Sequence, residues 1–472
     1  MSEYYKMSDR KKILLLNPPG KKLYIRDYYC SKVSQADYVY HPIDLLVQSG
    51  ILFQEFEPVL IDAIIEKFSG HQILEKIAAL KVSGVVALAG SVSWEEDISF
   101  FNALKEQNKV PLVVSGDVFR EGGENILKLN PSIDAIILDF TNTDALNFFK
   151  GNFDRIENAT FRSNGEIKSV TRDYKPGEFS IPLPRHEIFT GRNYRYPFVR
   201  EKVFSTILAD FGCPFNCSFC IMAELPFKWR NPGEIVIEIK YLNSLGIKEF
   251  FLATQTFGAN KKMAQGLCEQ IIRENISCGW TCFSRVDVVN EELLKLMKQA
   301  GCHTIIFGVE SGDEKILKEY RKQYTVEQIK NTLQTCERLG IETVATFILG
   351  LPEEDSESIE KTIKLAKSLP IDYASFNVAV PRMGTEMRDD AIMLGLVDQN
   401  KKVMDQSGSE VAMPTKKLTR KQVDAYRRKA VFSFYFRPSY ILNRLLKLKD
   451  IKSFTRQIKQ AIALVRQTWL NK

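Results

Sequence analysis

Three cysteines, Cys213, Cys217 and Cys220, lie within eight residues and form the strongest chemical pattern in the chain. A structural zinc site is normally closed by four Cys or His ligands, and the nearest histidines, His186 and His303, are far away in sequence. Iron–sulfur clusters are held by Cys thiolates, so a [4Fe–4S] cluster with three protein ligands would keep one iron open. The spacing therefore favours such a cluster, with a structural metal knuckle or three unrelated buried thiols as the alternatives.

An aromatic residue, Phe219, precedes the last of these cysteines. The resulting CxxxCxxC pattern resembles the motif of the radical S-adenosylmethionine (SAM) superfamily. The resemblance implies that the open iron chelates the amino and carboxylate groups of SAM, and that one electron from the cluster cleaves SAM to a 5′-deoxyadenosyl radical. It also implies an electron donor such as flavodoxin or ferredoxin.

Length, composition and charge are those of a globular protein with two or three domains, since the chain has 472 residues, 44% hydrophobic and 26% charged. The start of the chain does not resemble a signal peptide, and no apolar run reaches about 18 residues, so a spanning helix is not expected. An odd number of cysteines outside a small secreted scaffold predicts reduced thiols and a cytoplasmic location.

Strands and helices alternate regularly between residues 201 and 385. The expected strands are Val203–Ala209, Glu249–Ala253, Trp280–Ser284, Thr304–Val309, Thr343–Leu349 and Tyr373–Val380. Six βα units predict a partial (β/α)6 barrel, in which active residues lie at the carboxyl ends of the strands. By the resemblance this segment is the radical SAM core barrel.

Polar residues follow the second and third of these strands, and the resemblance implies that they contact SAM. Thr254 and Gln255 stand where related chains often carry an acidic pair, so the contact to the SAM amino group would lack a negative charge. Ser284 and Arg285 resemble the polar pair near the SAM carboxylate and ribose, and the planar fork of arginine suits a carboxylate. A salt bridge from Arg285 to Asp287 or to a helix is the alternative.

The fourth and fifth strands end in Glu310 and Gly350. Glu310 could accept hydrogen bonds from the ribose, hold Arg285, or form a structural ion pair. Gly350 lies in Phe347–Pro352, which resembles the backbone segment that embraces the adenine, and glycine permits close approach of a ligand. No catalytic acid or base is identified by the sequence. The remaining cysteines show no ligand spacing, and most are expected to be core residues: Cys30, Cys268, Cys278, Cys282, Cys302 and Cys336.

Residues 1–150 predict a doubly wound, Rossmann-like parallel sheet, because short apolar strands alternate with helical segments. The expected strands are the run beginning at Lys12, Val59–Asp62, Gly84–Ala89, Val110–Val114 and Ala135–Leu138. The Leu16–Pro19 opening, Ile61–Ala63 and the Gly/Ser turns resemble the cobalamin-binding domain of the B12-dependent radical SAM subfamily.

Ligands of such sheets lie beyond the carboxyl ends of the strands. The resemblance therefore implies that cobalamin contacts Asn17, Pro18, Gly90, Ser91, Ser93, Ser115 and Gly116. Two departures from the family are visible: the DxHxxG motif is absent, and Leu138–Asn142 replaces the usual Gly/Glu-containing segment. A sheet domain that has lost its corrinoid and acts as a scaffold or substrate lid is the alternative.

Residues 151–200 contain several prolines and an Asn-Gly pair at 164–165, and predict a linker that includes a hairpin. Residues 386–472 predict a basic helical C-terminal region. Residues 401–472 hold 18 Lys and Arg and 4 Asp and Glu, which gives them a net charge of +14. Because the net charge of the whole chain is +7, the other 400 residues have a net charge of −7. The basic character therefore belongs to the tail.

The tail combines a polar helix, expected at Lys417–Ala430, with aromatic residues interleaved with bases after it. Its Phe434–Pro438 segment resembles the branch that includes the anaerobic magnesium-protoporphyrin ester cyclase and hopanoid-modifying enzymes. Such a basic, aromatic helix suits peripheral contact with an anionic membrane. A helical cap that packs its aromatic residues on the barrel is the alternative.

The resemblance as a whole implies a cobalamin-dependent radical SAM enzyme that modifies an unactivated carbon, with methyl transfer to a lipid, isoprenoid or tetrapyrrole-like substrate as the leading hypothesis. Cyclisation, oxidation, rearrangement or carbon–carbon bond formation without net methylation would use the same radical. A tRNA methylthiotransferase would need a second cysteine triad, but only Cys30 precedes Cys213, so no nucleic-acid partner is expected. A non-catalytic Fe–S or corrinoid-binding protein is the last alternative.

Overall fold

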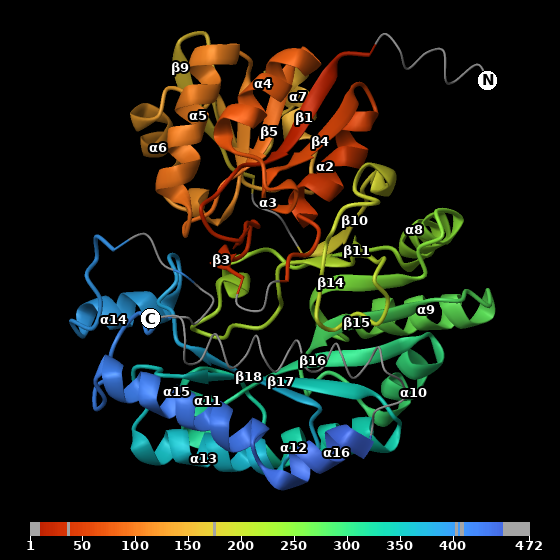
Figure 1. The fold of residues 1–472 in the computed structure, drawn as a ribbon, viewed down its shortest axis with the longest axis vertical. Coiled ribbons are helices and arrows are strands. Elements are labelled where there is room, and N and C mark those ends of the chain that lie inside the picture. The colour runs from red at the N-terminus through yellow and green to blue at the C-terminus, as the bar shows by residue number, and fades with distance from the viewer. Residues whose placement is uncertain (1–9, 35–37, 173–175, 402–404, 406–409, 447–472) are drawn as a thin grey trace.

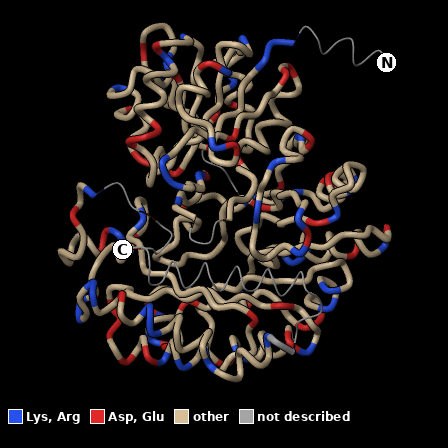
Figure 2. The backbone as a smooth tube through the Cα atoms, in the orientation of Figure 1, with Lys and Arg blue, Asp and Glu red and all other residues tan. Residues whose placement is uncertain are grey.

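Two α/β units lie one above the other along the longest axis of the molecule, with the N-terminal unit at the top of Figure 1. The computed structural model describes residues 10–34, 38–172, 176–401, 405 and 410–446. In both units the strands are largely free of charge, and Lys, Arg, Asp and Glu gather on the outer helices and loops (Figure 2). This distribution places the two sheets in the apolar interior.

The first unit is built on a seven-stranded sheet in the order β4-β1-β5-β6-β7-β8-β9, of which the first five strands are parallel. These strands are β1 (Lys12–Asn17), β4 (Glu57–Asp62), β5 (Gly84–Leu88), β6 (Leu112–Ser115) and β7 (Ala135–Ile137). Because β1 lies between β4 and β5, the strand order reverses there, as in a doubly wound sheet. The α/β class predicted for residues 1–150 is thus confirmed.

Helices cover both faces of this sheet. Alternate residues of β1 enter different cores: Ile13 and Leu15 pack on one face, and Leu14 and Leu16 on the other. This is why the strand is a continuous apolar run. The helices are α2 (Ile43–Phe53), α3 (Ala63–Glu66), α4 (Gly70–Leu80), α5 (Trp94–Asn108), α6 (Gly123–Leu129) and α7 (Asp144–Lys150), with short 3-10 turns η1 (Asp117–Phe119) and η2 (Phe153–Arg155).

The hairpin predicted around Asn164-Gly165 forms from β8 (Ala159–Ser163) and β9 (Glu166–Val170). It is not part of a linker, however, because β8 pairs antiparallel with β7 and extends the first sheet. The expected linker from residue 151 onward is therefore partly sheet. The reason is that β7 would otherwise be an exposed edge with unpaired backbone groups.

The second unit is a six-stranded parallel sheet in the consecutive order β11-β14-β15-β16-β17-β18, which is the predicted partial barrel. Its strands are β11 (Ser205–Leu208), β14 (Glu249–Phe257), β15 (Gly279–Ser284), β16 (Cys302–Glu310), β17 (Glu342–Leu349) and β18 (Tyr373–Val378). The helices that follow are α8 (Pro232–Ser244), α9 (Lys261–Arg273), α10 (Glu291–Gln299), α11 (Glu314–Glu319), α12 (Val326–Arg338), α13 (Ser356–Ser368) and α14 (Glu386–Met393).

Short polar side chains start most of these helices. Asn260, Asn290, Thr325 and Asp355 each accept a hydrogen bond from a backbone N–H in the first turn of the helix that follows. Such N-caps contribute about 1 kcal/mol each. They fix the point where each strand-end loop returns into a helix, and so define the length of the loops at the carboxyl edge.

A smaller sheet, with its strands in the order β10-β13-β12, joins the two units. Its strands are β10 (Gly177–Phe179), β12 (Asp210–Phe211) and β13 (Lys228–Arg230). Two 3-10 turns lie between these strands in the sequence, η3 (His186–Ile188) and η4 (Ile221–Glu224). The ring of Phe211 lies 5.8 Å from Tyr28, 5.7 Å from Tyr29 and 5.6 Å from Phe140, centroid to centroid. These three partners belong to the first unit. The strand that leads into the cysteines is therefore packed directly against the first sheet.

The segment Leu138–Asn142, which departs from the family pattern, contacts the smaller sheet. Lys228 of β13 places its Nζ 2.5 Å from Asp139 Oδ2 and 2.8 Å from Thr141 Oγ1. Both ionic partners are nearly fully buried, and such a pair is costly to break. This segment therefore fastens the first unit to the second.

The described part of the tail packs on the barrel. In α15 (Arg420–Tyr435) the ring of Phe434 is fully buried, and the hydroxyl of Tyr435 donates to the Ala374 carbonyl at 2.7 Å. Tyr440 of α16 (Pro438–Leu446) donates to the Asp372 carbonyl at 2.8 Å. The cap alternative thus holds for Phe434, Tyr435 and Tyr440, whereas Phe432 and Phe436 are exposed, and residues 447–472 lie outside the described residues. No helix in the described part of the chain is long and apolar enough to cross a membrane.

Candidate functional site

The three predicted metal ligands lie on one loop, at the carboxyl edge of the barrel and against the first unit. Cys217 is buried, and Cys213 and Cys220 are half-buried. Burial raises the pKa of the Cys213 and Cys220 thiols, and each is raised further by the neighbouring thiol of Cys217. The three side chains are therefore close enough to interact, and all are of the type that holds iron–sulfur clusters.

The sulfur atoms do not yet converge on a common point. Cys213 Sγ lies 3.5 Å from the hydroxyl of Thr256, and Cys217 Sγ accepts a hydrogen bond from Arg285 Nη1 at 3.4 Å. Over the residues that the structure describes, no group of three His, Cys, Asp or Glu is arranged to hold a metal ion.

Arg285 and Glu310 lie beside this loop, but they do not pair with each other. Arg285 forms the alternative salt bridge, with its Nη2 2.9 Å from Asp287 Oδ2, and its guanidinium lies 3.9 Å from the centre of the Phe215 ring. Glu310 instead accepts from Lys322 Nζ at 3.1 Å. Glu310 therefore forms the structural ion pair that was one of its alternatives, and it does not hold Arg285, because a cation from a different loop is closer.

Lys322 connects the predicted residues to one another. Its side chain is buried, its backbone carbonyl accepts from Arg285 Nη2 at 2.6 Å, and its Nζ lies 5.7 Å from the centre of the Phe219 ring. Phe219 in turn packs on Tyr320, with ring centroids 6.2 Å apart. One lysine thus links the cysteine loop and the ends of β15 and β16.

Thr254 and Gln255 surround a carboxylate that the sequence analysis did not select. Asp210 of β12 accepts from the hydroxyl of Thr254 and, at 2.8 Å, from the backbone N–H of Gln255. Burial raises the pKa of Asp210 to about 7, although both hydrogen bonds oppose the rise. The acidic group missing from the end of β14 is therefore supplied by the neighbouring β12. Gln255 remains half-buried at this position.

Ser284 and Gly350 are engaged within the protein. The Ser284 hydroxyl donates to the Phe257 carbonyl at 2.7 Å and so ties the ends of β15 and β14 together. Gly350 has a positive φ of 84°, and a Cβ there would lie 2.7 Å from Val423 of α15. Glycine is thus needed for the turn and for the close approach of α15.

A buried acid holds the turn at Gly350. Glu354 Oε2 accepts from the N–H groups of Gly350 at 2.7 Å and Leu351 at 3.1 Å, while its Oε1 has no partner among the described residues. Burial raises the pKa of this carboxyl to about 8, against both backbone hydrogen bonds. The folded chain therefore favours the neutral carboxyl near pH 7.

We expect Glu354→Gln to flatten the pH dependence of stability. The pKa of Glu354 is higher in the folded chain than in the unfolded chain. The stability gained from the protonated carboxyl is therefore complete below the unfolded pKa, and it is lost as the pH rises through about 8. A neutral amide keeps the acceptor without this loss, so the variant should become more stable than the parent by a few kcal/mol above about pH 8. Urea unfolding across pH measures this difference, with the nearby Glu353→Gln as the control. Parallel curves for parent and E354Q would contradict it.

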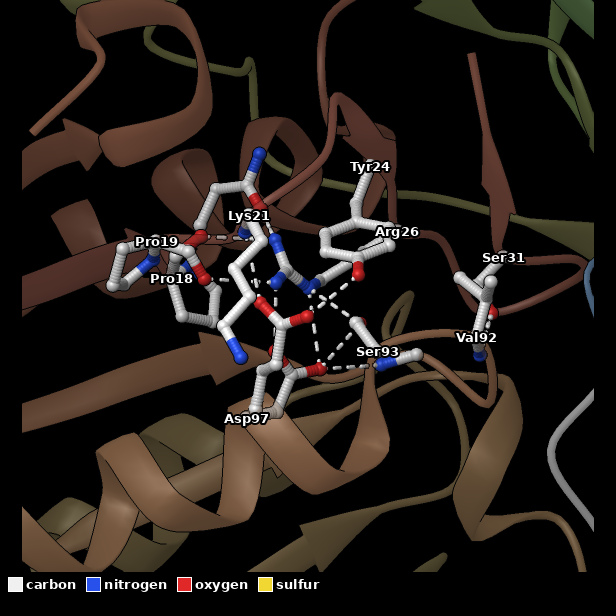
Figure 3. A network of polar contacts seen from close by, with 12 residues as sticks. Pro18, Pro19, Lys21, Tyr24, Arg26, Ser31, Val92, Ser93 and Asp97 are labelled. Carbon is white, nitrogen blue, oxygen red and sulfur yellow. Dashed lines mark hydrogen bonds and ion pairs between the residues drawn. The ribbon is translucent and has the colours of Figure 1, made fainter. Parts of the chain in front are cut away.

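At the carboxyl edge of the first sheet the predicted residues join a buried network around Arg26 (Figure 3). Arg26 Nη2 lies 2.7 Å from Asp97 Oδ1, and both side chains are fully buried. Arg26 Nη1 donates to the side chain of Asn17 at 3.0 Å and to the Pro18 carbonyl at 2.9 Å. Ser93 donates to Asp97 at 2.7 Å. Of the predicted contacts, Asn17, Pro18 and Ser93 are thus held by one ion pair.

Two of the other predicted residues of this edge, Ser91 and Ser115, are held by two further acids. The Ser91 hydroxyl donates to Asp117 Oδ2 at 2.9 Å, and the Ser115 hydroxyl to Asp44 Oδ2 at 3.2 Å. Gly90 donates its N–H to Asp97 at 3.0 Å, and a Cβ at Gly116 would collide with the Ala89 carbonyl, 1.8 Å away. The structure therefore gathers the seven residues at one edge, but their polar side chains already bond to the protein.

Two polar groups at this edge lack such bonds. The hydroxyl of Tyr29 and Nη1 of Arg120 are buried without a hydrogen-bond partner in the described part of the chain. Neither was predicted, because nothing in its spacing distinguishes it. Asp210, Lys322 and Arg26 were missed for a related reason: each acts on residues distant in sequence. For Lys322 the only local sign is its place in the polar Tyr320–Tyr324 turn between two helices.

Comparison with known proteins agrees with this architecture. The family model of the radical SAM superfamily matches residues 211–366. An uncharacterized methyltransferase from Pyrococcus horikoshii is 30% identical over 420 residues, which cover 86% of this chain and 90% of that protein. This chain belongs to the radical SAM superfamily. As a radical SAM enzyme it carries its cysteine triad inside the matched segment.

Other relatives of this radical SAM enzyme are more distant. The anaerobic magnesium-protoporphyrin IX monomethyl ester cyclase of Rubrivivax gelatinosus is 28% identical over 68% of this chain, which spans 61% of that protein. A similar fold is found in the methyltransferase TsrM from Kitasatospora setae, whose structure has cobalamin and a [4Fe–4S] cluster bound. The match covers 96% of this chain and 99% of TsrM, with a TM-score of 0.70 and 15% sequence identity. The structure of the cobalamin-dependent enzyme OxsB matches with a TM-score of 0.69 and 14% sequence identity. This match covers 98% of this chain and 73% of OxsB. At these identities the two structures support the fold.

Proposed function

We propose that this chain is a cobalamin-dependent radical SAM methyltransferase that acts on an unactivated carbon of a hydrophobic substrate. The observation that carries the proposal is the placement of the cysteine loop directly against the carboxyl edge of the first sheet, through the contacts of Phe211 with Tyr28, Tyr29 and Phe140. A radical generated at the loop and a cofactor on the sheet would thus meet at one interface. Relatives named as methyltransferases and as a hopanoid C-2 methylase support the reaction class.

The residues present fit the two cofactors by chemistry. Cys213, Cys217 and Cys220 would hold a [4Fe–4S] cluster, because thiolates are its ligands. The unpartnered Tyr29 hydroxyl and Arg120 guanidinium at the sheet edge fit a molecule with amide and phosphate groups, as cobalamin has. When bound, the cluster supplies the electron that cleaves SAM, and cobalamin supplies the methyl group.

The chain's own residues would bind, orient and exclude solvent. Arg285 is buried beside Cys217 and presents a cation where the resemblance places the carboxylate of SAM. Asp210 and Gln255 offer oxygen acceptors at the end of β14 for the amino group. Lys322 fixes Glu310 beside the same loop. The aromatic contacts across the interface limit the access of water.

The test is anaerobic purification with iron, sulfide and hydroxocobalamin, followed by measurement of iron and corrinoid per chain. We expect about four irons and one corrinoid per chain. With methyl-deuterated SAM and lipid, isoprenoid or tetrapyrrole substrates, a product that gains one labelled methyl group supports the proposal. About four irons without corrinoid would contradict it. A product without an added methyl group would favour the cyclase-like alternative, which the similarity to the protoporphyrin ester cyclases motivates.

The partners follow from the same chemistry and stay predictions. Reduction of a cluster requires an electron donor such as flavodoxin or ferredoxin. Peripheral membrane contact through the basic tail and a cytoplasmic location are predictions too. Phe434, Tyr435 and Tyr440 pack on the barrel, so such contact would rely on other side chains of the tail, among which Phe432, Phe436 and Leu442 are exposed.

A further inference from the structure

Three cationic side chains, Lys32, Arg120 and Arg382, lie where the first unit meets the cysteine loop. We name them the cation cluster. Lys32 begins β3 (Lys32–Val33), which pairs with β2 (Tyr24–Ile25) in a small hairpin between the two units (Figure 1). Within the described ranges, none of the three side chains forms an ion pair or donates a hydrogen bond.

The first unit holds two members of the cluster against aromatic rings. The guanidinium of Arg120 lies 5.8 Å from the centre of the Tyr28 ring, and its Nη1 is buried. The ammonium of Lys32 lies 6.0 Å from the Tyr38 ring and 5.9 Å from the Tyr40 ring. Aromatic faces stabilise a cation partly, but they leave its N–H groups without acceptors.

The third member comes from the loop after β18, which touches both units. A Cβ at Gly384 would lie 3.5 Å from Glu121 of the first unit and 3.6 Å from Ile221, the residue after Cys220. The backbone N–H of Met387 also donates to the Ser218 carbonyl, inside the cysteine loop, at 3.0 Å. Arg382 is therefore carried to the junction by packing on both sides.

Electrostatic effects place the three cations in one neighbourhood. Burial lowers the pKa of Arg382, but Cys30, Cys220 and Asp117 outweigh it and leave the pKa raised. Burial lowers the pKa of Arg120, against the opposing effects of Tyr28 and Asp117 among others. The charge of Arg382 also opposes protonation of Lys32. Arg120 and Arg382 thus share Asp117 as an acidic neighbour, while Lys32 and Arg382 share Asp27 and repel each other.

The nearest carboxylates are occupied by other hydrogen bonds. Asp117 accepts from the N–H and hydroxyl groups of Ser31 and Ser91. Asp27 accepts from the N–H groups of Tyr29 and Cys30 and from the hydroxyl of Tyr40. These acids reduce the repulsion between the cations, but the guanidinium forks and the ammonium group keep unused donors. The three residues are half-buried, and cations that are partly removed from water are costly unless they are paired.

We propose that the cation cluster binds an anionic group, a carboxylate or phosphate, of a molecule that lies between the first sheet and the cysteine loop. Arginine forks match both groups by paired hydrogen bonds. The group belongs either to the substrate, which would then be a hydrophobic molecule with an acidic end, or to the corrinoid, whose nucleotide loop contains a phosphodiester. Both sources rest on the proposed function, whereas the anion site itself does not.

The anion site is tested by calorimetric titration with inorganic phosphate of the full chain, reconstituted anaerobically with iron and sulfide but without corrinoid, so that no corrinoid phosphodiester fills the site. We expect saturable binding that weakens at least about 10-fold in Arg120→Met and in Arg382→Met, because each loses charge-assisted hydrogen bonds. Arg420→Met, an exposed arginine at the start of α15, should bind like the parent. Iron content and circular dichroism report folding, and Arg120→Lys and Arg382→Lys should keep more binding than the methionine variants.

Corrinoid titrations distinguish the two sources. If the anion belongs to the corrinoid, the methionine variants bind hydroxocobalamin at least about 10-fold more weakly, but bind cobinamide, which lacks the phosphodiester, like the parent. If it belongs to the substrate, both corrinoids bind the parent and the variants equally while phosphate binding is lost. The proposal is overturned if the folded parent does not bind phosphate, or if the variants bind phosphate and both corrinoids as the parent does. Failure to retain any corrinoid would count against the proposed function and leave the phosphate result valid.

Discussion

Replacing Cys213, Cys217 or Cys220 by alanine is expected to abolish cluster binding and SAM cleavage. The three thiols lie on one loop, and each would supply one of only three protein ligands. The other barrel cysteines do not offer a substitute: Cys268, Cys282, Cys302 and Cys336 are buried in the core between the sheet and its helices. Removal of one thiol should therefore reduce 5′-deoxyadenosine formation to background.

The matched control is Cys278→Ala. Cys278 immediately precedes β15 and donates to the Ala300 carbonyl at 3.6 Å, so it lies at the amino edge of the sheet, opposite the cysteine loop. We expect this variant to keep its iron and its activity. Iron per chain, the visible absorbance of the cluster, and 5′-deoxyadenosine formed with SAM and dithionite are the measurements. Full iron content in C213A, or loss of iron in C278A alone, would refute the assignment.

The second large effect is expected from Asp97→Asn in the first unit. Asp97 neutralises Arg26 at 2.7 Å, with both side chains fully buried, and also accepts from Ser93 and from the N–H of Gly90. The amide would leave the guanidinium as an uncompensated buried charge. Removal of one partner of such a pair costs about 3–5 kcal/mol, so the free energy of unfolding of this unit should fall by that amount.

Two further variants test the physical reason. Glu124→Gln removes an exposed partner of Lys128, 4.0 Å away, and should change stability by less than about 0.5 kcal/mol. The double variant Arg26→Met/Asp97→Leu removes both buried charges and should recover most of the loss. Urea unfolding followed by circular dichroism measures all three. A double variant as unstable as Asp97→Asn would show that the hydrogen bonds of Arg26, and not its charge, maintain this edge.

The loss of Asp97 should also affect the hairpin that carries Lys32. Arg26 follows β2 directly and donates to the Pro18 and Pro19 carbonyls, so it ties β2, the partner strand of β3, to the residues that follow β1. A site for an anion that includes Lys32 depends on that anchoring. Faster proteolysis within residues 18–33 of Asp97→Asn is the expected sign of this coupling.

The sequence predicted most of the features that depend on local order. The spacing of Cys213, Cys217 and Cys220 lies within one loop, so it identified the candidate ligands without any knowledge of the fold. Strands buried on both faces require continuous apolar runs such as Ile13–Leu16, and the alternation of strand and helix then determines a parallel sheet. The order of the residues along the chain was enough for these features.

Only the tertiary structure decided which charged groups meet. The sequence left three alternatives open for Glu310, and it forms the structural ion pair, with Lys322, because the turn between α11 and α12 returns to the strand ends. Arg26 meets Asp97 across 71 residues, and Thr254 meets Asp210 across 44. The hairpin after Asn158 joins the first sheet because β7 offers an unpaired edge. Such partners have no periodicity or spacing in the sequence, since they are selected by proximity in space and by the high cost of burying an unpaired charge.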